Sequence, residues 1–168
     1  MLVTSGAVGH GSRVIPLELD SRLRGNDTFN YVRKAAAGIG QIHLMSIFAN
    51  AFRHLGAESA QVLVTKRSLS RERESLHTLL SLYLTHGVIP LINENDVLEL
   101  NSFGGNDLLA AEIAGLLIAE AVVILSTKKG SAHGVGGGAT KQEAKMMLQE
   151  KNIQTIIVDG KKKGILLD

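Results

Sequence analysis

Cysteine is absent from this 168-residue sequence, and several other residue types are scarce. The chain has no tryptophan, two prolines and 4% aromatic residues. Without cysteine it can form no disulfide, use no thiol nucleophile and hold no metal through sulfur. The shortage of aromatics leaves Leu, Ile, Val and Ala to fill the core. A chain without disulfides fits a reducing compartment, so we expect a cytoplasmic protein.

Concentrated charge and long apolar runs are also missing. The formal net charge is +2, and the only basic run is Lys161 to Lys163, which we interpret as a solvated surface turn. We therefore expect no nucleic-acid partner. No apolar run approaches transmembrane length, and Met1 is followed by a strand-like segment instead of a signal sequence. We expect no membrane partner either.

The remaining composition, 45% hydrophobic over 168 residues, fits one domain spanning residues 1–168. Apolar patterns and glycine stops predict alternating strands and helices along the whole chain. The predicted strands cover residues 2–4, 61–65, 88–92, 121–125 and 153–158, and the predicted helices cover 31–55, a segment from a cap at Ser68 or Ser70 to a stop at Gly87, 107–119 and 139–151. Such alternation favours an α/β fold with a mostly parallel sheet. Pro90 places its strand at an edge, an end or a bulge, and the unbroken apolar run 121–125 predicts a strand buried on both faces.

A glycine-rich stretch, GVGGGATK, covers residues 134–141. Glycines let backbone N–H groups approach an anion, and the helix that follows adds its positive end, so an anion-binding turn is one interpretation. A flexible linker is another. A third is a dinucleotide site, with Gly134, Gly136 and Ala139 in the loop and Asp159 about twenty residues further on. The loop does not match the Walker A spacing.

Two polar clusters flank a short link in LINENDVLELNSFGGND, residues 91–107. Their amides can donate to a carboxylate and their carboxylates can hold an ammonium group or Mg²⁺. The cluster residues are Asn93, Glu94, Asn95, Asp96, Asn106 and Asp107. A plainer role for Asn106 or Asp107 is to cap the next helix. The stretch SGAVGHG, with Ser5 as a donor, could cradle a ligand or form an ordinary turn. The scattered histidines show no metal-ligand spacing.

Taken together, seven stretches carry a resemblance: VTSGAVGHG, AAAGIGQIHLM, QVLVTKRSLSRERE, GVIPLINEND, FGGNDLLAAEIA, GVGGGATKQEA and IIVDGKKKGIL. In order and spacing they resemble the glutamate 5-kinase family of the amino acid kinase superfamily. The resemblance implies a three-layer α/β/α sandwich with a mostly parallel sheet. It also implies ATP-dependent phosphorylation of the side-chain carboxylate of L-glutamate, the first step of proline biosynthesis, with Mg²⁺ bridging the ATP phosphates.

The resemblance also assigns residues by matching positions. It implies that glutamate is bound by Ser5, Gly6, Asp96 and Asn106. It implies that ATP is bound by Ser126, Thr127, Gly136, Gly137, Thr140 and Lys141. Lys141 would be a catalytic cation on the transferred phosphoryl group, and Asp107 would organise the catalytic lysine. No residue is predicted to ligate a metal directly.

The sequence departs from the family pattern in three places. Gly105 stands where the family has a carboxylate before its Asn-Asp pair, and Ser126-Thr127 stands where it has Thr-Asp. We also expect an incomplete domain, because the family's opening strand and lysine loop, part of its nucleotide-covering segment and its C-terminal RNA-modification-type domain have no match here. Losing a cationic clamp costs about a hundredfold or more in rate, so we expect very low or no activity from this chain, or an inactive ligand-binding module. Unpaired sheet edges predict a homo-oligomer.

Overall fold

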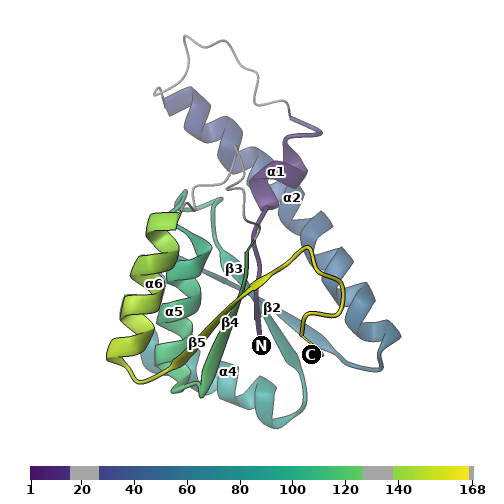
Figure 1. The fold of residues 1–168 in the computed structure, drawn as a ribbon. Helices are drawn as coiled ribbons and strands as arrows, with labels where there is room; N and C mark the ends of the chain where they lie inside the picture. Colours follow the sequence, from purple (N-terminus) through teal and green to yellow (C-terminus); the bar gives the residue numbers. More distant parts are fainter. Residues whose placement is uncertain (16–26, 127–137, 167–168) are drawn as a thin grey trace. The chain divides into compact units, whose positions relative to one another are not determined.

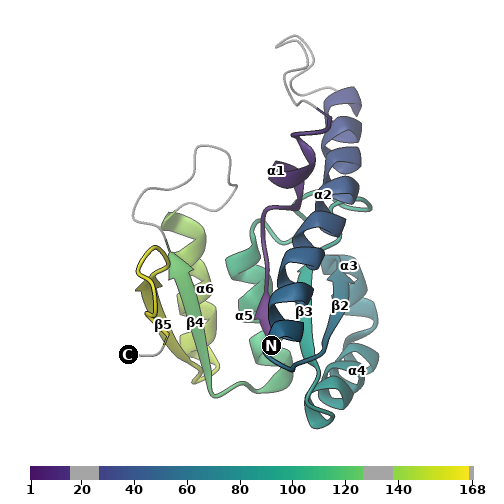
Figure 2. The same cartoon turned by 90° about the vertical axis from the view of Figure 1, so that its right-hand side faces the viewer.

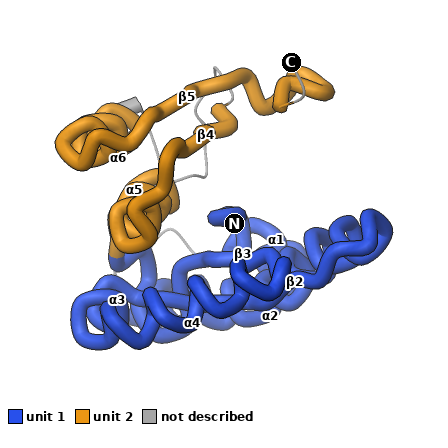
Figure 3. The backbone as a smooth tube through the Cα atoms, turned by 90° about the horizontal axis from the view of Figure 1, so that it is seen from below, with its two compact units in different colours: residues 1–102 blue, residues 103–168 orange. Residues whose placement is uncertain are grey.

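The structure is a computed structural model that describes residues 1–15, 27–126 and 138–166 (Figure 1). It divides into two compact units, Met1–Ser102 and Phe103–Asp168, which Figure 3 colours separately. Each unit is described by itself below. The prediction of one domain over residues 1–168 remains a prediction.

Unit 1 contains a three-stranded parallel sheet in the order β1-β3-β2 (Figure 2). Its strands are β1 (Leu2–Val3), β2 (Ser59–Val64) and β3 (Ile89–Glu94). The central strand β3 pairs with both neighbours, so that Ile92 lies between Val3 and Val62. Because all strands are parallel, their carboxyl ends lie at one edge, and the residues that follow β1 and β3 leave the sheet there.

Four helices belong to unit 1: α1 (Ala7–Gly11), α2 (Asp27–His54), α3 (Lys66–Arg71) and α4 (Arg73–Thr85). Helix α2 packs against α1 and β2, while α4 packs against β3. A core cluster joins Ala7 of α1, Leu44 and Met45 of α2, and Leu91 of β3. The sequence predicts a loop from residue 10 to residue 30. Instead α1 reaches Gly11 and α2 begins at Asp27, four residues before the predicted start.

The expectation of no apolar segment of transmembrane length is wrong for α2. By length and composition alone this 28-residue helix could cross a membrane, and a third of its most apolar window is buried within the protein. A core helix of a soluble protein has the same composition. Helix α2 packs on α1 and on β2, while large apolar side chains such as Ile42 and Ile47 are exposed.

The helix after β2 begins earlier than predicted and is broken in two. Thr65, not Ser68 or Ser70, is its N-cap: the Thr65 hydroxyl accepts from the Ser68 N–H at 3.0 Å, and the Ser68 hydroxyl accepts from the Thr65 N–H at 2.9 Å. This reciprocal pair is a capping box in which Ser takes the place of Glu or Gln at the third helical position. The substitution of Ser for Glu or Gln hid the cap from sequence reasoning.

Pro90 is the second residue of β3, which confirms its predicted place near a strand end. The strand is nevertheless the central one of its sheet. In a parallel ladder, successive N–H groups point to alternate neighbours, and the Ile89 N–H donates toward the β2 side, to Glu58. The nitrogen of Pro90 therefore faces the β1 side, where pairing starts only at Leu91. The missing N–H costs no ladder hydrogen bond.

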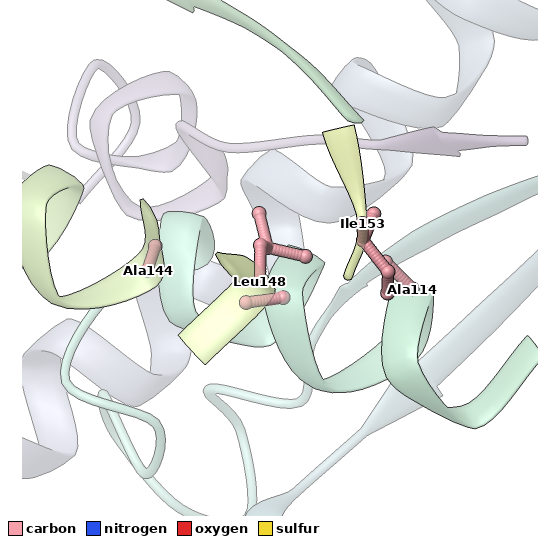
Figure 4. Packing of buried hydrophobic residues seen from close by; sticks show 5 residues of the cluster. Ala114, Ala144, Leu148 and Ile153 are labelled. Atoms are coloured by element: carbon pink, nitrogen blue, oxygen red, sulfur yellow. The ribbon is translucent and has the colours of Figure 1, made fainter. Parts of the chain in front are cut away.

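Unit 2 contains α5 (Asn106–Leu117), β4 (Ala121–Ser126), α6 (Gly138–Glu150) and β5 (Gln154–Asp159). The two strands form a parallel pair, and α5 packs on α6. Small residues let the two helices approach the sheet closely. One cluster of buried residues consists of Ala111, Ala114, Ala144, Leu148 and Ile153 (Figure 4). Other apolar residues of unit 2 are also buried, among them Leu109, Ile113 and Ile124.

The prediction that residues 121–125 are buried on both faces is wrong. Val123 and Leu125 are 44% and 51% exposed, and Ile157 of β5 is 47% exposed. The helices α5 and α6 pack against this sheet, and these alternate side chains are left uncovered by the described residues. The apolar run 121–125 correctly indicated a strand, but it did not indicate whether a second layer of helices covers the other face.

The α/β fold with parallel strands is confirmed. Every strand pairing in the described residues is parallel, although they form two sheets instead of one. Element boundaries agree with the prediction within a few residues, apart from α1, which replaces a predicted glycine loop, the early start of α2 and the break between α3 and α4.

Candidate functional site

The segment after β3 in unit 1 is folded into a compact turn by its own polar side chains. The Asn101 N–H donates to Asp96 Oδ1 at 3.0 Å, and the Asn95 N–H donates to the Val64 carbonyl at 2.8 Å. From α2, Lys34 donates to the Leu98 carbonyl at 2.8 Å. These bonds fix the half-buried Asp96 directly beyond the end of the strand.

The surroundings of Asp96 oppose its ionisation. Burial raises the pKa of the Asp96 carboxyl above its usual 3.8, and the Asn101 hydrogen bond and the positive charge of Arg33 only partly oppose that shift. A carboxylate that the protein itself does not fully stabilise is suited to receive a cation from outside.

A cleft of about 250 Å³ opens beside Asp96 within unit 1. Its wall comes from α1, α2, β2 and the segment after β3. The polar residues that line it are Gln41, Gln61, Glu94, Asn95 and Asp96, with apolar contributions from Ala7, Ala37, Ile42, Leu63 and Val97 and the backbone of Gly38. The carboxyl groups of Glu94 and Asp96 favour a ligand that carries an ammonium group.

Gln41, a residue of this wall, forms a buried pair with the carboxamide of Asn93. Sequence reasoning did not connect these two residues. Asn93, 1% exposed, donates through Nδ2 to Gln41 Oε1 at 2.7 Å. Asn93 was a candidate from the sequence, whereas Gln41 was missed. A usable signal was present, because Gln41 falls on the apolar stripe of α2 beside the buried Leu44 and Met45.

The predicted residues Ser5 and Gly6 connect β1 to α1 and are exposed. Gly6 has a φ of 104°, in the region that L residues rarely adopt, so glycine is required there. The neighbouring Thr4 is held against β3 by a bond from its N–H to the Ile92 carbonyl at 2.8 Å. Ser5 and Gly6 therefore follow directly from the strand end, although neither is among the described residues that line the cleft.

Unit 2 brings together two residues that the sequence places 34 positions apart. Lys141 Nζ of α6 lies 2.6 Å from Asp107 Oδ2 of α5. Both side chains are partly exposed, 25% for Lys141 and 20% for Asp107. Asp107 lies in the first turn of α5, and Lys141 in the first turn of α6. Two separate motifs, GGND and GGGATK, thus meet in one ion pair.

The predicted helix cap at Asn106 or Asp107 is wrong. The N-cap is Gly105, with a φ of 146°, and no side chain caps this end of α5. Asn106 is the first helical residue, and its Oδ1 is buried without a hydrogen-bond partner in the described part of the chain. The Asp107 side chain is paired with Lys141 instead of with the helix end.

The remaining predicted nucleotide-binding residues are only partly described. Ser126 ends β4 and its carbonyl accepts from the Gly160 N–H at 2.9 Å; Thr140 lies in the first turn of α6. Thr127, Gly136 and Gly137 lie outside the described residues.

The dinucleotide alternative rests on Gly134 and Gly136, which lie outside the described residues, and on Ala139 and Asp159. Asp159 ends β5, and its Oδ1 accepts from the Lys161 N–H at 3.0 Å, which closes the local turn. This bond gives Asp159 a structural role.

Among residues 1–15, 27–126 and 138–166, no group of three or more His, Cys, Asp or Glu side chains could hold a metal ion.

The sequence of the chain is similar to those of known proteins. The chain matches the model of the amino acid kinase family over residues 1–130. It is 34% identical to a glutamate 5-kinase from Syntrophotalea carbinolica, in an alignment that covers 99% of this chain and 53% of the relative. It is 30% identical to the glutamate 5-kinase of Clostridium acetobutylicum, over 96% of this chain and 72% of the relative. It is 35% identical to glutamate 5-kinase 2 of Bacillus subtilis, over 91% of this chain and 40% of the relative.

The chain thus spans about half the length of the Syntrophotalea carbinolica relative. The family model nevertheless covers most of the chain, including both polar clusters and the strand that ends at Ser126. The chain belongs to the amino acid kinase family.

Proposed function

We propose that this chain carries the site of a glutamate 5-kinase, which transfers the terminal phosphoryl group of ATP to the side-chain carboxylate of L-glutamate. The observation that carries the proposal is the 2.6 Å ion pair between Lys141 and Asp107, which joins the two motifs expected to hold the phosphates. The relatives named glutamate 5-kinase support the choice of substrate.

In this proposal Lys141 provides positive charge where negative charge accumulates during transfer. The attacking carboxylate oxygen forms a bond to the terminal phosphorus as the bond to the leaving ADP oxygen breaks. Such transfer depends mainly on positioning and electrostatic stabilisation. Asp107 holds the flexible Lys141 side chain in one orientation before the nucleotide arrives, which reduces the entropy lost on binding.

The amino acid would be held from the segment after β3. The Asp96 carboxylate would accept hydrogen bonds from the ammonium group of glutamate. These bonds would replace the hydration that the carboxylate loses through burial. The family resemblance also implies that Asn106, Ser5 and Gly6 bind glutamate.

ATP would be held by Ser126, Thr127, Gly136, Gly137, Thr140 and Lys141. Mg²⁺ prefers oxygen ligands, keeps several waters and commonly binds through substrate phosphates. The described residues offer no cluster of carboxylates for it, and Asp107 is already paired, so Mg²⁺ would enter with the ATP phosphates. Bound there, it would neutralise phosphate charge.

The wider setting follows from the same proposal. The reaction is the first step of proline biosynthesis, in the cytoplasm, with L-glutamate and ATP as partners and with no nucleic acid or membrane. A homo-oligomer would cover strand edges that are unpaired among the described residues. Turnover should be very low, because Gly105 stands where the family resemblance implies a carboxylate.

A coupled assay for ADP, with L-glutamate, ATP and Mg²⁺, tests the reaction, and calorimetry tests the binding of each ligand. We expect both ligands to bind. We expect turnover roughly a hundredfold or more below that of a full-length glutamate 5-kinase. Lys141→Met should weaken ATP binding by roughly tenfold or more and abolish the residual turnover.

Lys145→Met is the matched control, because Lys145 lies on the same helix and outside the ion pair. It should leave ATP binding unchanged. Binding of glutamate and ATP with no turnover at all would favour the ligand-binding module over the kinase. If Lys141→Met and Lys145→Met have equal effects, the role assigned to Lys141 is wrong.

A further inference from the structure

The buried pair formed by Gln41 and Asn93 is only half satisfied. One hydrogen bond joins them, from Asn93 Nδ2 to Gln41 Oε1. Gln41 Nε2 and Asn93 Oδ1 are both buried and have no hydrogen-bond partner among the described residues. An unpaired buried donor or acceptor is uncommon in proteins and destabilises the fold that contains it.

The position of Gln41 distinguishes it from an ordinary core residue. It is 7% exposed, and it contributes to the wall of the cleft that Asp96 also lines. Its orientation is fixed, because the bond from Asn93 occupies Oε1 and leaves the NH₂ group as the free end. Gln41, whose Nε2 is buried and unpaired among the described residues, thus lines the same cleft as the carboxyl-bearing Asp96, from a different part of its wall.

A ligand that satisfies both side chains must carry an acceptor and an ammonium group, which is the chemistry of an amino acid. We propose that Gln41 is a substrate-binding residue whose Nε2 donates to a carboxylate oxygen of the bound amino acid, with Asn93 as the positioning residue that orients it. This inference rests on the proposed function for the identity of that amino acid. An unpaired donor in the empty protein is then a pre-arranged contact, completed only on binding.

A purely structural role for Gln41 makes a different prediction. If Gln41 served only to accept from Asn93, a side chain that keeps the acceptor and lacks the NH₂ group would serve equally well. Gln41→Glu is that side chain, and Gln41→Met removes both groups at similar length. Asn50→Asp is the matched control, because Asn50 lies exposed on the same helix and loses the same NH₂ group.

Calorimetric titration of the full chain with three ligands separates the roles. The ligands are L-glutamate, L-glutamine, which lacks the side-chain carboxylate, and isoglutamine, which lacks the main-chain carboxylate. We expect Gln41→Met and Gln41→Glu each to weaken L-glutamate binding by roughly tenfold or more. One of the two amide ligands lacks the carboxylate that Gln41 binds. For that ligand the Gln41 variants should lose less affinity, because its contact with Gln41 is already weak in the wild type.

Unchanged affinity for L-glutamate in both variants overturns the inference, and so do equal losses for all three ligands, which would indicate a general structural effect. Asn50→Asp should match the wild type. If one of the Gln41 variants fails to fold, the other decides. Glutamate binding that depends on Gln41 without phosphoryl transfer would contradict the kinase reaction and leave this inference intact. If the wild-type chain binds none of the three ligands, the assignment of the cleft to an amino acid is wrong.

Discussion

At the scale of single residues, the half-buried Asp96 carboxyl group reduces stability when it is ionised. A raised pKa means that the folded protein holds the Asp96 proton more tightly than the unfolded chain does. Between the ordinary value of 3.8 and the higher folded value, the folded state binds more protons than the unfolded state. The free energy of unfolding contributed by this group therefore decreases as pH rises through that window.

Asp96→Asn tests this sign directly. The amide oxygen can still accept from the Asn101 N–H, while the buried charge is removed. We expect the variant to melt at a higher temperature than the wild type at pH 7, with the difference vanishing below pH 3.8. Glutamate affinity should decrease by roughly tenfold or more, because the ammonium group loses an ionic partner. Thermal melts across the pH range and calorimetry measure the two effects.

Glu150→Gln, an exposed carboxylate at the end of α6, controls for the change in net charge. A variant Asp96→Asn that melts lower than the wild type at pH 7 would show that the carboxylate stabilises the turn after β3. The account of Asp96 as a destabilising, ligand-directed charge would then be wrong.

Also at residue scale, the sequence indicated contacts between residues that belong to two recognisable motifs. It did not indicate contacts of a residue that lies outside any motif. The family resemblance implied that Asp107 organises Lys141, and the structure joins these two residues in an ion pair. The Gln41–Asn93 pair could not be predicted, because a single glutamine within an apolar helix gives no indication of its partner 52 positions away. The capping role of Thr65 was hidden for a similar reason, since Ser68 took the usual place of Glu or Gln.

At the scale of secondary-structure elements, the contact between α1 and α2 positions the loop that contains Ser5 and Gly6. The two helices approach so closely that a Cβ atom at Gly40 would overlap the Ala7 carbonyl oxygen, and one at Gly11 would overlap the Ala36 carbonyl oxygen. Both obstacles are backbone atoms, which cannot rotate away. The glycines are therefore required by the approach of two helices and not by their own backbone angles.

Gly40→Ala should consequently have the opposite effect to an ordinary glycine replacement. In a helix interior, alanine is favoured over glycine by about 1 kcal/mol. Here overlap should outweigh that gain and lower the free energy of unfolding by roughly 3 kcal/mol, the upper range for overpacking. Gly38→Ala on the same helix is the control, because its Cβ would lie 3.5 Å from Val97, an ordinary contact, and it should stabilise the protein. Urea unfolding of both variants decides; if both are stabilised, the helices are not in this close contact.

The elements also show what limits prediction from sequence. The spacing of apolar residues predicted α2 and the strands, because an element with one buried face repeats apolar residues at a regular interval along the chain. The break between α3 and α4 and the exposed face of β4 and β5 depend on what packs against them, which the local order does not contain. Pro90 illustrates the same limit: its tolerance in a central strand depends on where β1 begins to pair, 88 residues away in sequence.

At the scale of the whole molecule, each of the two compact units contains a cluster of buried apolar residues. The core cluster of unit 1 contains Leu44, Met45 and Leu91, and that of unit 2 contains Leu148 and Ile153 with three alanines. The prediction of one domain over residues 1–168 therefore requires that the two units unfold together.

Leu148→Ala provides the test, because Leu148 is fully buried in the core of unit 2. Removing it should lower the free energy of unfolding by about 2–5 kcal/mol. In a single cooperative domain, amide hydrogen exchange through global unfolding should then increase in β3 of unit 1 as well as in α5 and β4 of unit 2. Leu80→Ala in α4, also fully buried, gives the reciprocal measurement from unit 1. Exchange that increases only in the substituted unit for both variants would mean that the chain consists of two independently unfolding domains, and the single-domain prediction would be wrong.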